Sequence, residues 1–298
     1  MNGVPPMTER RRGLLYGVAA YGLWGVVPLF WKLLAGVDPV EVLAHRAVWG
    51  MVAFAAIVWI AEAGPPLRAA LRERRTLAVM ALSSTLLAIN WGTFVGAVST
   101  GHLLDASLGY FMNPLVSIAL GMIVLGERLR RLQWLAIGCA VAGVAVLTWR
   151  AGRVPWISFV LAGSFGGYGL VRKLARVDSL VGSTIETILM FPIAAVYLAI
   201  LAARGGGALG HAAPSIAMLL IATGVVTAGP LLLFTSAARR LPLSTVGFLQ
   251  YLAPTGQFLI AVLAFHEAFT ADKLVAFGMI WVGLIVFSID LWRSPAHE

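Results

Sequence analysis

The stretch Asp105-Ala-Ser-Leu-Gly-Tyr-Phe-Met-Asn-Pro-Leu115 decides the fold class, because the pattern that begins at its proline occurs twice in the chain. The spacing Pro-x12-Glu-x10-Gly-x4-Gly starts at Pro114 and again at Pro254, 140 positions downstream. Four residues repeated at one spacing indicate two related halves. In both copies the segment before the glutamate is apolar and interrupted near its middle by Gly, Pro and polar side chains. Each copy therefore predicts a broken transmembrane helix.

The composition places the chain in a lipid bilayer. Of its 298 residues 60% are hydrophobic and only 12% are charged, and the mean hydropathy is +0.89, which is too apolar for a soluble domain of this length. The net charge of +9 comes from short basic clusters between apolar spans and predicts no nucleic-acid partner. The single cysteine, Cys139, lies inside an apolar span and excludes an internal disulfide.

About 20 apolar residues cross a bilayer as a helix, and this length predicts an all-α polytopic fold of ten transmembrane helices. The predicted spans are residues 13–35, 40–61, 76–99, 105–126, 132–149, 154–172, 179–203, 214–238, 242–265 and 271–291. The longest links, around residues 62–75 and 204–213, are expected to be ordinary loops. The apolar run after Arg12 is too long for a signal peptide, so we expect an uncleaved first helix.

The basic residues predict the orientation of these spans. Sixteen of the 22 lysines and arginines fall on the N-terminus, alternate loops and the C-terminus, so the positive-inside rule places both termini in the cytoplasm. Each half then holds five spans, and an odd number makes the second half enter the membrane from the opposite side. The expected domains are residues 13–149 and 154–292, arranged as inverted repeats.

Several short motifs resemble a known family. They are Ala44-His-Arg-Ala-Val-Trp49, Asn90-Trp91, Ala106-Ser-Leu-Gly-Tyr-Phe-Met-Asn-Pro-Leu115, Leu125-Gly-Glu-Arg128, Tyr168-Gly-Leu-Val-Arg-Lys173 and Ile185-Glu-Thr187. With the repeated proline and glutamate, they are similar to the tandem EamA domains of the drug/metabolite transporter superfamily, and to its RarD branch in particular. The resemblance implies a bacterial inner-membrane exporter with a central cavity, driven without ATP. Its relatives include exporters of aromatic and other neutral amino acids.

Polar and aromatic side chains near the middle of the spans form the predicted substrate site. The candidates are Tyr110, Asn113, Asn90, Trp91, Gln250, Tyr251, Trp24 and Tyr168. Interrupted spans in matching positions of two repeats are where transporters bind substrate, and Pro114 and Pro254 would act as hinges. An alternative stays open: amides often join helices in membranes, and most aromatic residues of such a protein are packing or interfacial residues.

Arg46 and Glu186 are ionisable residues well inside predicted spans, which makes them candidates for function. They are also 140 positions apart, but inverted repeats place them toward opposite faces, so each needs a local partner. The expected partners are Asp105 or Glu41 for Arg46, and Lys173 or Arg176 for Glu186. Two such clusters would brace an outer and an inner gate, and static ion pairs are an equally weighted alternative.

The two repeated glutamates, Glu127 and Glu267, fall at helix ends near water, and we expect them to cap helices or brace loops. The sequence has no Walker A motif, no HExxH and no cluster of His, Cys and carboxylates at metal-ligand spacing. It therefore predicts no enzyme, no cofactor and no metal.

These observations predict an alternating-access exporter of a small solute, with a neutral or aromatic amino acid favoured. Two other functions stay open: export of hydrophobic drugs or another metabolite, and a non-transporting membrane subunit. Small-residue motifs such as Gly13-x3-Gly17 support close helix packing without identifying a dimer, so a monomer is compatible with the sequence.

Overall fold

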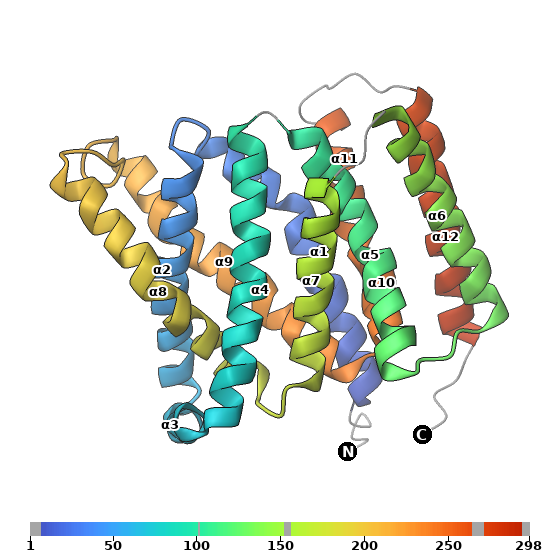
Figure 1. Ribbon diagram of the computed structural model, residues 1–298, viewed down its shortest axis with the longest axis horizontal. Coiled ribbons are helices and arrows are strands. Elements are labelled where there is room, and N and C mark those ends of the chain that lie inside the picture. The colour runs from blue at the N-terminus through green and yellow to red at the C-terminus, as the bar shows by residue number, and fades with distance from the viewer. Residues whose placement is uncertain (1–6, 101, 152–155, 264–270, 294–298) are drawn as a thin grey trace, which may run out of the picture.

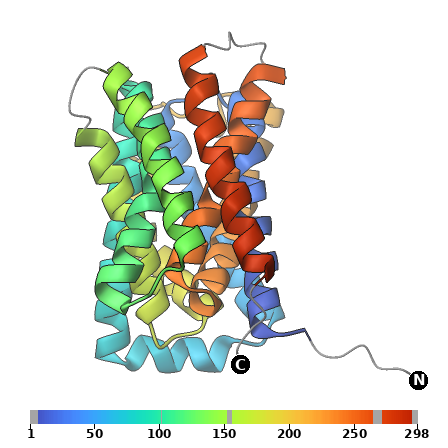
Figure 2. The same ribbon diagram turned by 90° about the vertical axis from the view of Figure 1, so that its right-hand side faces the viewer.

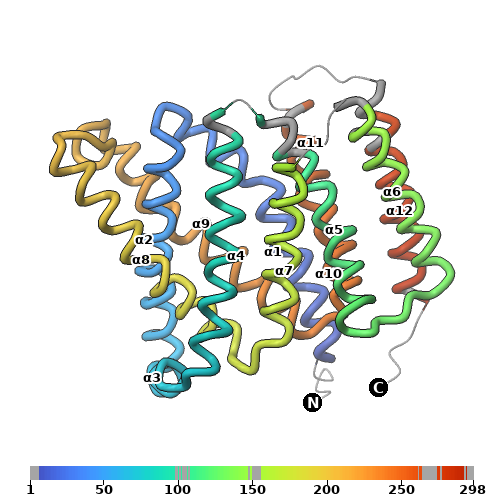
Figure 3. The backbone as a smooth tube through the Cα atoms, in the orientation of Figure 1, coloured from blue at the N-terminus to red at the C-terminus, as the bar shows by residue number. Residues whose placement is uncertain are grey.

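The computed structural model describes residues 7–100, 102–151, 156–263 and 271–293, and these ranges form twelve α-helices and no strand. The helices are α1 (Glu9–Leu33), α2 (Pro39–Ile60), α3 (Gly64–Arg72), α4 (Arg74–Ser99), α5 (Leu103–Leu125), α6 (Arg131–Ala151), α7 (Trp156–Leu174), α8 (Ser179–Ala203), α9 (Pro214–Arg240), α10 (Leu243–Gln250), α11 (Leu252–Leu263) and α12 (Ala271–Arg293). Each of the ten predicted ranges overlaps a described helix, and the ninth overlaps two, α10 and α11. The backbone runs back and forth between two ends of the bundle (Figure 3).

The helices have the length and the surface of a polytopic membrane protein. Six of those described, α1, α2, α4, α5, α8 and α9, are long and apolar enough to cross a membrane. Large apolar side chains cover the outside of the bundle: Trp59, Ile123 and Trp149 are each more than 80% exposed. Exposed apolar surface on this scale is stable only against lipid or another apolar partner. The chain is therefore a multi-pass membrane protein.

The first and last helices meet at one end of the bundle. A guanidinium nitrogen of Arg10 on α1 donates a hydrogen bond to the Leu291 carbonyl on α12, at 3.2 Å. Figure 1 shows α1 beginning and α12 ending at this same end. We call it the terminal end.

Residues 64–72 form a helix, so the prediction of an ordinary loop there is wrong. Helix α3 lies across the terminal end of the bundle, nearly perpendicular to the long helices (Figure 2). Pro65 and Pro66 occupy its first turn, where a proline costs no hydrogen bond. Leu67 and Leu71 pack against buried Met80 and its neighbours, while Arg68 is exposed. The helix forms because this amphipathic pattern lets it cover the end of the bundle.

The prediction of a break in both repeated segments holds in only one copy. Helix α5 continues through Pro114, whereas the second copy is interrupted at Tyr251, three residues before Pro254. Pro254 has no N–H group and cannot donate to the Gln250 carbonyl four residues earlier. At the end of α10, the Tyr251 amide donates to the Phe248 carbonyl, three residues back, at 3.2 Å. Helix α10 packs tightly against α5 at its proline, since a methyl group on Gly247 of α10 would meet the Pro114 carbonyl at 2.8 Å. This packing supports the continuous α5 at Pro114.

The core lies between helices that are distant in sequence. The closest helix pairs include α5 with α7, α6 with α12, α1 with α9, and α2 with α8 and α9. Tyr21, Phe54, Tyr168 and Phe234, from α1, α2, α7 and α9, belong to one buried cluster. Folding thus packs the two halves of the sequence against each other.

Close packing of α2 on α9 gives a first prediction. A methyl group on Gly224 would overlap the Trp49 backbone, whereas Gly229 on the same helix has open space. Gly224→Ala is expected to destabilise the fold by about 1–3 kcal/mol through overpacking. Gly229→Ala is expected to have no effect or to stabilise slightly, since alanine favours helix. The midpoint of thermal unfolding in detergent checks this, and equal midpoints for the two variants would contradict it.

Candidate functional site

An aromatic cluster occupies the centre of the bundle. The Trp24 ring lies 5.5 Å from Tyr21 and 5.8 Å from both Phe165 and Phe234, measured between centroids. Tyr168 stacks on Phe234 at 5.6 Å. Trp24 and Tyr168, predicted as substrate residues from opposite halves, thus belong to one cluster. Trp24 is half-buried, whereas Tyr168 is fully buried and has a separate hydrogen-bond role.

Beside this cluster lies a group of polar side chains that we call the polar seam: Tyr21, Asn113, Ser117 and Gln250. Gln250 on α10 donates from Nε2 to Ser117 Oγ on α5 at 2.9 Å, and Asn113 lies one turn from Ser117. Tyr21 Oη lies near the Gln250 amide without hydrogen-bond geometry. Asn113 Oδ1, Gln250 Oε1 and Tyr21 Oη are buried and have no hydrogen-bond partner among the described residues. Buried polar atoms usually have partners. Other atoms in the described residues also have none, among them Trp49 Nε1 and Tyr251 Oη, but the seam brings three together.

Asn90 joins two helices and does not face the polar seam. Its Nδ2 donates to the Leu161 carbonyl at 2.9 Å and to Ser164 Oγ at 3.1 Å, both on α7. Both N–H groups of the amide are therefore engaged. This is the interhelical role that the sequence left open for amides.

Tyr251 lies where α10 ends, but it is buried in a separate apolar cluster with Phe111 and Phe277. Its hydroxyl has no hydrogen-bond partner among the described residues. The structure thus does not bring Tyr251 into the polar seam, although it follows Gln250 directly in sequence.

Arg46 lies among four other helices. Its Nε donates to Thr227 Oγ1 on α9 at 3.2 Å, and its guanidinium carbon stands 4.9 Å from the centre of the Trp31 ring and 4.5 Å from that of Trp91. Tyr110 on α5 lies within electrostatic range of the guanidinium. We call these five residues the Arg46 site. It unites Arg46, predicted to belong to a gate, with Trp91 and Tyr110, predicted to bind substrate.

The predicted pairing of Arg46 with Glu41 is wrong, because Glu41 is engaged elsewhere. Its carboxylate accepts a hydrogen bond from the Ala208 amide at 2.6 Å and lies 3.6 Å from His45 Nε2. The other predicted partner, the Asp105 side chain, lies outside the described residues. Within the described part of the chain, Arg46 forms no ion pair with a carboxylate.

Glu186 has a local partner, as predicted, but the partner is Arg172 and not Lys173 or Arg176. The carboxylate accepts from Ser83 Oγ at 2.5 Å and from Tyr168 Oη at 3.2 Å, and it lies 3.6 Å from Arg172 Nε. These four side chains have no exposed surface. We call them the Glu186 network, and it ties α4, α7 and α8 together.

Helix geometry explains the one-position error. Tyr168 and Arg172 are four residues apart and share a face of α7, whereas Lys173 is turned by about 100°. Lys173 instead donates to the Leu241 carbonyl at 2.5 Å, where α9 ends. The i, i+4 spacing was the available signal for Arg172, but no sequence pattern singled out Ser83 on α4.

Glu127 caps a helix of the opposite half. Its carboxylate oxygens accept hydrogen bonds from the Leu243 amide at 2.6 Å and the Ser244 amide at 2.9 Å, at the start of α10. The predicted capping role of Glu127 is therefore confirmed. Glu267, its counterpart, lies outside the described residues.

Comparisons with known proteins agree with this architecture. Residues 11–149 match the model of the EamA-like transporter family. Protein RarD of Streptomyces exfoliatus is 46% identical over 290 residues, 97% of this chain and 92% of its own length. An uncharacterized transporter of Pseudomonas aeruginosa is 46% identical over 285 residues, 95% of each chain. A crystal structure of a protein only 19% identical shares the fold, with a TM-score of 0.75 over 96% of this chain and all of that one.

The class of protein is thus a polytopic membrane transporter. Within that class, the chain belongs to the RarD-like branch of the drug/metabolite transporter superfamily, as the sequence motifs predicted.

The Glu186 network gives a second prediction. Arg172→Met leaves a buried carboxylate without its cation, which costs about 3–5 kcal/mol. The double variant Arg172→Met, Glu186→Leu removes both charges and is expected to recover most of this loss. Arg239→Met is the matched control, because its 3.3 Å pair with Asp178 is at the surface and is worth at most about 1 kcal/mol. Thermal unfolding in detergent measures all three variants. A double variant less stable than Arg172→Met would contradict the prediction.

Proposed function

We propose that this protein exports small metabolites across the bacterial inner membrane by alternating access, and that neutral and aromatic amino acids are its substrates. The observation that carries the proposal is the polar seam, where Asn113 Oδ1, Gln250 Oε1 and Tyr21 Oη have no partner among the described residues. A polar solute crossing between the halves would supply those partners. The adjacent Trp24 ring suits a flat apolar side chain.

The proposal includes ten spans in two inverted repeats, residues 13–149 and 154–292. The 140-residue repeat pairs each helix of the first half with one of the second. Helices α1, α2, α4, α5 and α6 correspond to α7, α8, α9, α10–α11 and α12. The support for the repeats is that a contact between two helices recurs between their counterparts. The contact of α1 with α9 then becomes that of α7 with α4, and the contact of α5 with α7 becomes that of α11 with α1. The contact of α2 with α9 becomes that of α8 with α4, and all six contacts occur.

The terminal end is proposed to face the cytoplasm. The bond from Arg10 to the Leu291 carbonyl brings the first and last helices to one end, as an even number of crossings requires. Most lysines and arginines belong to this end, and the positive-inside rule assigns such an end to the cytoplasm.

Two elements of the alternating-access proposal have separate structural support. The helix is interrupted at Tyr251, three residues before Pro254, which is proposed as a hinge inside the ninth span. Pro114 marks the corresponding position of α5. The Glu186 network joins helices near the terminal end and is proposed to brace the inner gate. Tyr110 and Trp91 are proposed as substrate contacts nearer the opposite end.

Counterflow of labelled Phe into proteoliposomes tests the function and the site together. We expect saturable flux that Trp and Met inhibit. Asn113→Ala and Gln250→Ala are each expected to raise the half-saturation concentration about five- to tenfold, because each removes a hydrogen bond worth about 1–1.5 kcal/mol. Gln133→Ala is the matched amide control, since Gln133 bonds only the Arg130 amide near the start of α6.

Either part of the proposal can fail by itself. No flux of any neutral amino acid through folded protein would contradict the substrate class, and flux of a hydrophobic drug instead would favour drug export. Unchanged kinetics in both seam variants would contradict the proposed site while leaving transport intact.

A further inference from the structure

The Arg46 guanidinium is open to a ligand. A guanidinium carries five N–H donors, and the Arg46 site uses one of them, from Nε to Thr227. The two Nη nitrogens form no hydrogen bond with the described residues, yet they are not among the buried polar atoms without partners. They therefore reach accessible space, consistent with the half-buried state of the side chain.

A cation at this depth requires an anion. The centres of the Trp31 and Trp91 rings lie 4.9 and 4.5 Å from the guanidinium carbon, and each contact contributes about 0.5–2 kcal/mol. Ring faces do not neutralise a charge, however, and unpaired charges inside a membrane bundle are costly. The charge of the Arg46 site thus lacks a counter-ion among the described side chains, in contrast to that of Arg172.

We propose that Arg46 binds the carboxylate of the transported solute, so that the substrate is a small carboxylic acid with an apolar or aromatic body. The planar guanidinium matches a carboxylate through paired N–H donors. The indoles of Trp31 and Trp91 flank the bound group, and Asn113 Oδ1, one turn from Tyr110 on α5, is a free acceptor for an ammonium group. This inference rests on the proposed transport function and gives Arg46 a role in recognition rather than in a gate.

Competition by matched acids and amides tests it. The inhibition of labelled Phe counterflow by 3-phenylpropionate, phenylalaninamide and unlabelled Phe is measured in the parent protein and in the variants Arg46→Gln and Arg46→Lys. We expect Phe and 3-phenylpropionate to inhibit and the amide to be at least tenfold weaker. Arg46→Gln is expected to weaken Phe binding by about 10- to 100-fold, as loss of a charge-assisted hydrogen bond does, and to abolish the preference for acids. Arg46→Lys is expected to restore part of that preference.

The outcomes separate this inference from the proposed function. Phe transport with equal inhibition by acid and amide would overturn the role of Arg46 and leave amino acid export standing. If no amino acid is transported, the amino acid proposal fails, and heat stabilisation by 3-phenylpropionate decides the Arg46 site. Stabilisation of the parent protein but not of Arg46→Gln supports the carboxylate site, and its absence in both overturns it.

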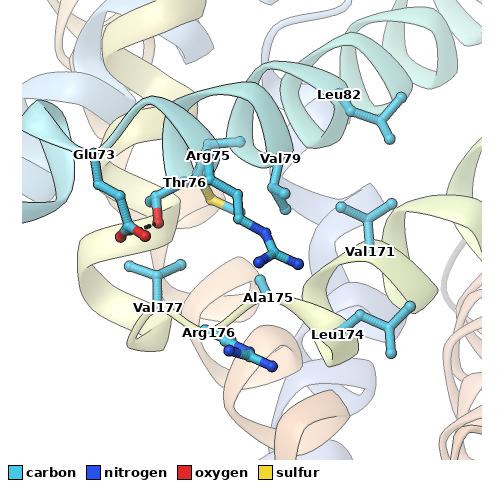
Figure 4. Close-up of a pocket in the computed structure, with 11 residues that line it drawn as sticks. Glu73, Arg75, Thr76, Val79, Leu82, Val171, Leu174, Ala175, Arg176 and Val177 are labelled. Carbon is cyan, nitrogen blue, oxygen red and sulfur yellow. Dashed lines mark hydrogen bonds between the residues drawn. The ribbon is translucent and has the colours of Figure 1, made fainter.

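A surface groove lies at the terminal end, between the start of α4 and the end of α7 (Figure 4). Its volume is about 320 Å³. Apolar side chains form its wall, among them Leu82 and Leu174, which are more than half exposed on the outside of the bundle. Arg75 of α4 and Arg176, two residues after α7, also line it, as does Glu73, which accepts a hydrogen bond from Thr76 at 2.8 Å (Figure 4).

We infer that this groove binds an anionic phospholipid. Arg75 and Arg176 are exposed and form no ion pair within the described part of the chain, so both are available to a headgroup phosphate. Leu82, Val171 and Leu174 provide the apolar wall for an acyl chain. A groove that combines apolar side chains with two arginines matches the two ends of such a lipid.

Native mass spectrometry of delipidated protein tests the lipid site. One phosphatidylglycerol is expected to bind more tightly than phosphatidylcholine with the same acyl chains. The double variant Arg75→Gln, Arg176→Gln is expected to weaken phosphatidylglycerol binding at least tenfold, at about 1 kcal/mol per arginine. The control Arg68→Gln, Arg72→Gln removes two exposed arginines of α3 that do not line the groove. Equal weakening by both pairs would show diffuse attraction and overturn the site. Equally tight binding of glycerol 3-phosphate would overturn its assignment to a lipid.

Discussion

The interior of a membrane protein offers a polar atom no partner except another protein group, water in a cavity or a solute. This constraint divides the polar residues of the chain into two kinds. Glu186 has three partners on two other helices, Ser83 on α4 and Tyr168 and Arg172 on α7, and none of them is exposed. Asn113, Gln250 and Arg46 keep free acceptors or donors deep in the bundle. The Glu186 network holds helices together, whereas the free atoms of Asn113, Gln250 and Arg46 are the ones we propose for a ligand.

Arg46 and Glu186 occupy corresponding positions of the two halves, and their surroundings differ accordingly. Around Glu186, Ser83 and Arg172 complete the network. The position that corresponds to Ser83 in the second half is Thr223, whose hydroxyl bonds its own helix at the Leu220 carbonyl. Corresponding positions therefore hold a carboxylate with three protein partners in the second half and a guanidinium with free donors in the first. Under the proposed alternating access, this difference gives the two ends of the pathway different chemistry.

The sequence predicted what depends on hydropathy and local spacing, namely the ten helical ranges, the family and the capping by Glu127. It missed α3, because nine amphipathic residues with two prolines and two arginines resemble a linker when only hydropathy is considered. It also misjudged contacts that depend on helix rotation. Arg172 differs from Lys173 by about 100° around α7, and Asn90 bonds α7 only because that helix packs against α4. Such neighbours are set by tertiary packing, which one sequence does not specify.

The distribution of polar bonds also indicates which helices move together. Gln250 of α10 bonds Ser117 of α5, and Glu127, two residues after α5, caps α10. These two helices thus form one unit, while the Glu186 network binds α4, α7 and α8 into another. The contact between the units, α5 against α7, brings apolar side chains close to backbone: a methyl group on Gly166 would meet Val116 at 2.8 Å. Directional bonds resist sliding, whereas small shear movements between packed helices need no bond to break. Under the proposed mechanism, the α5–α7 contact is therefore where one unit moves against the other.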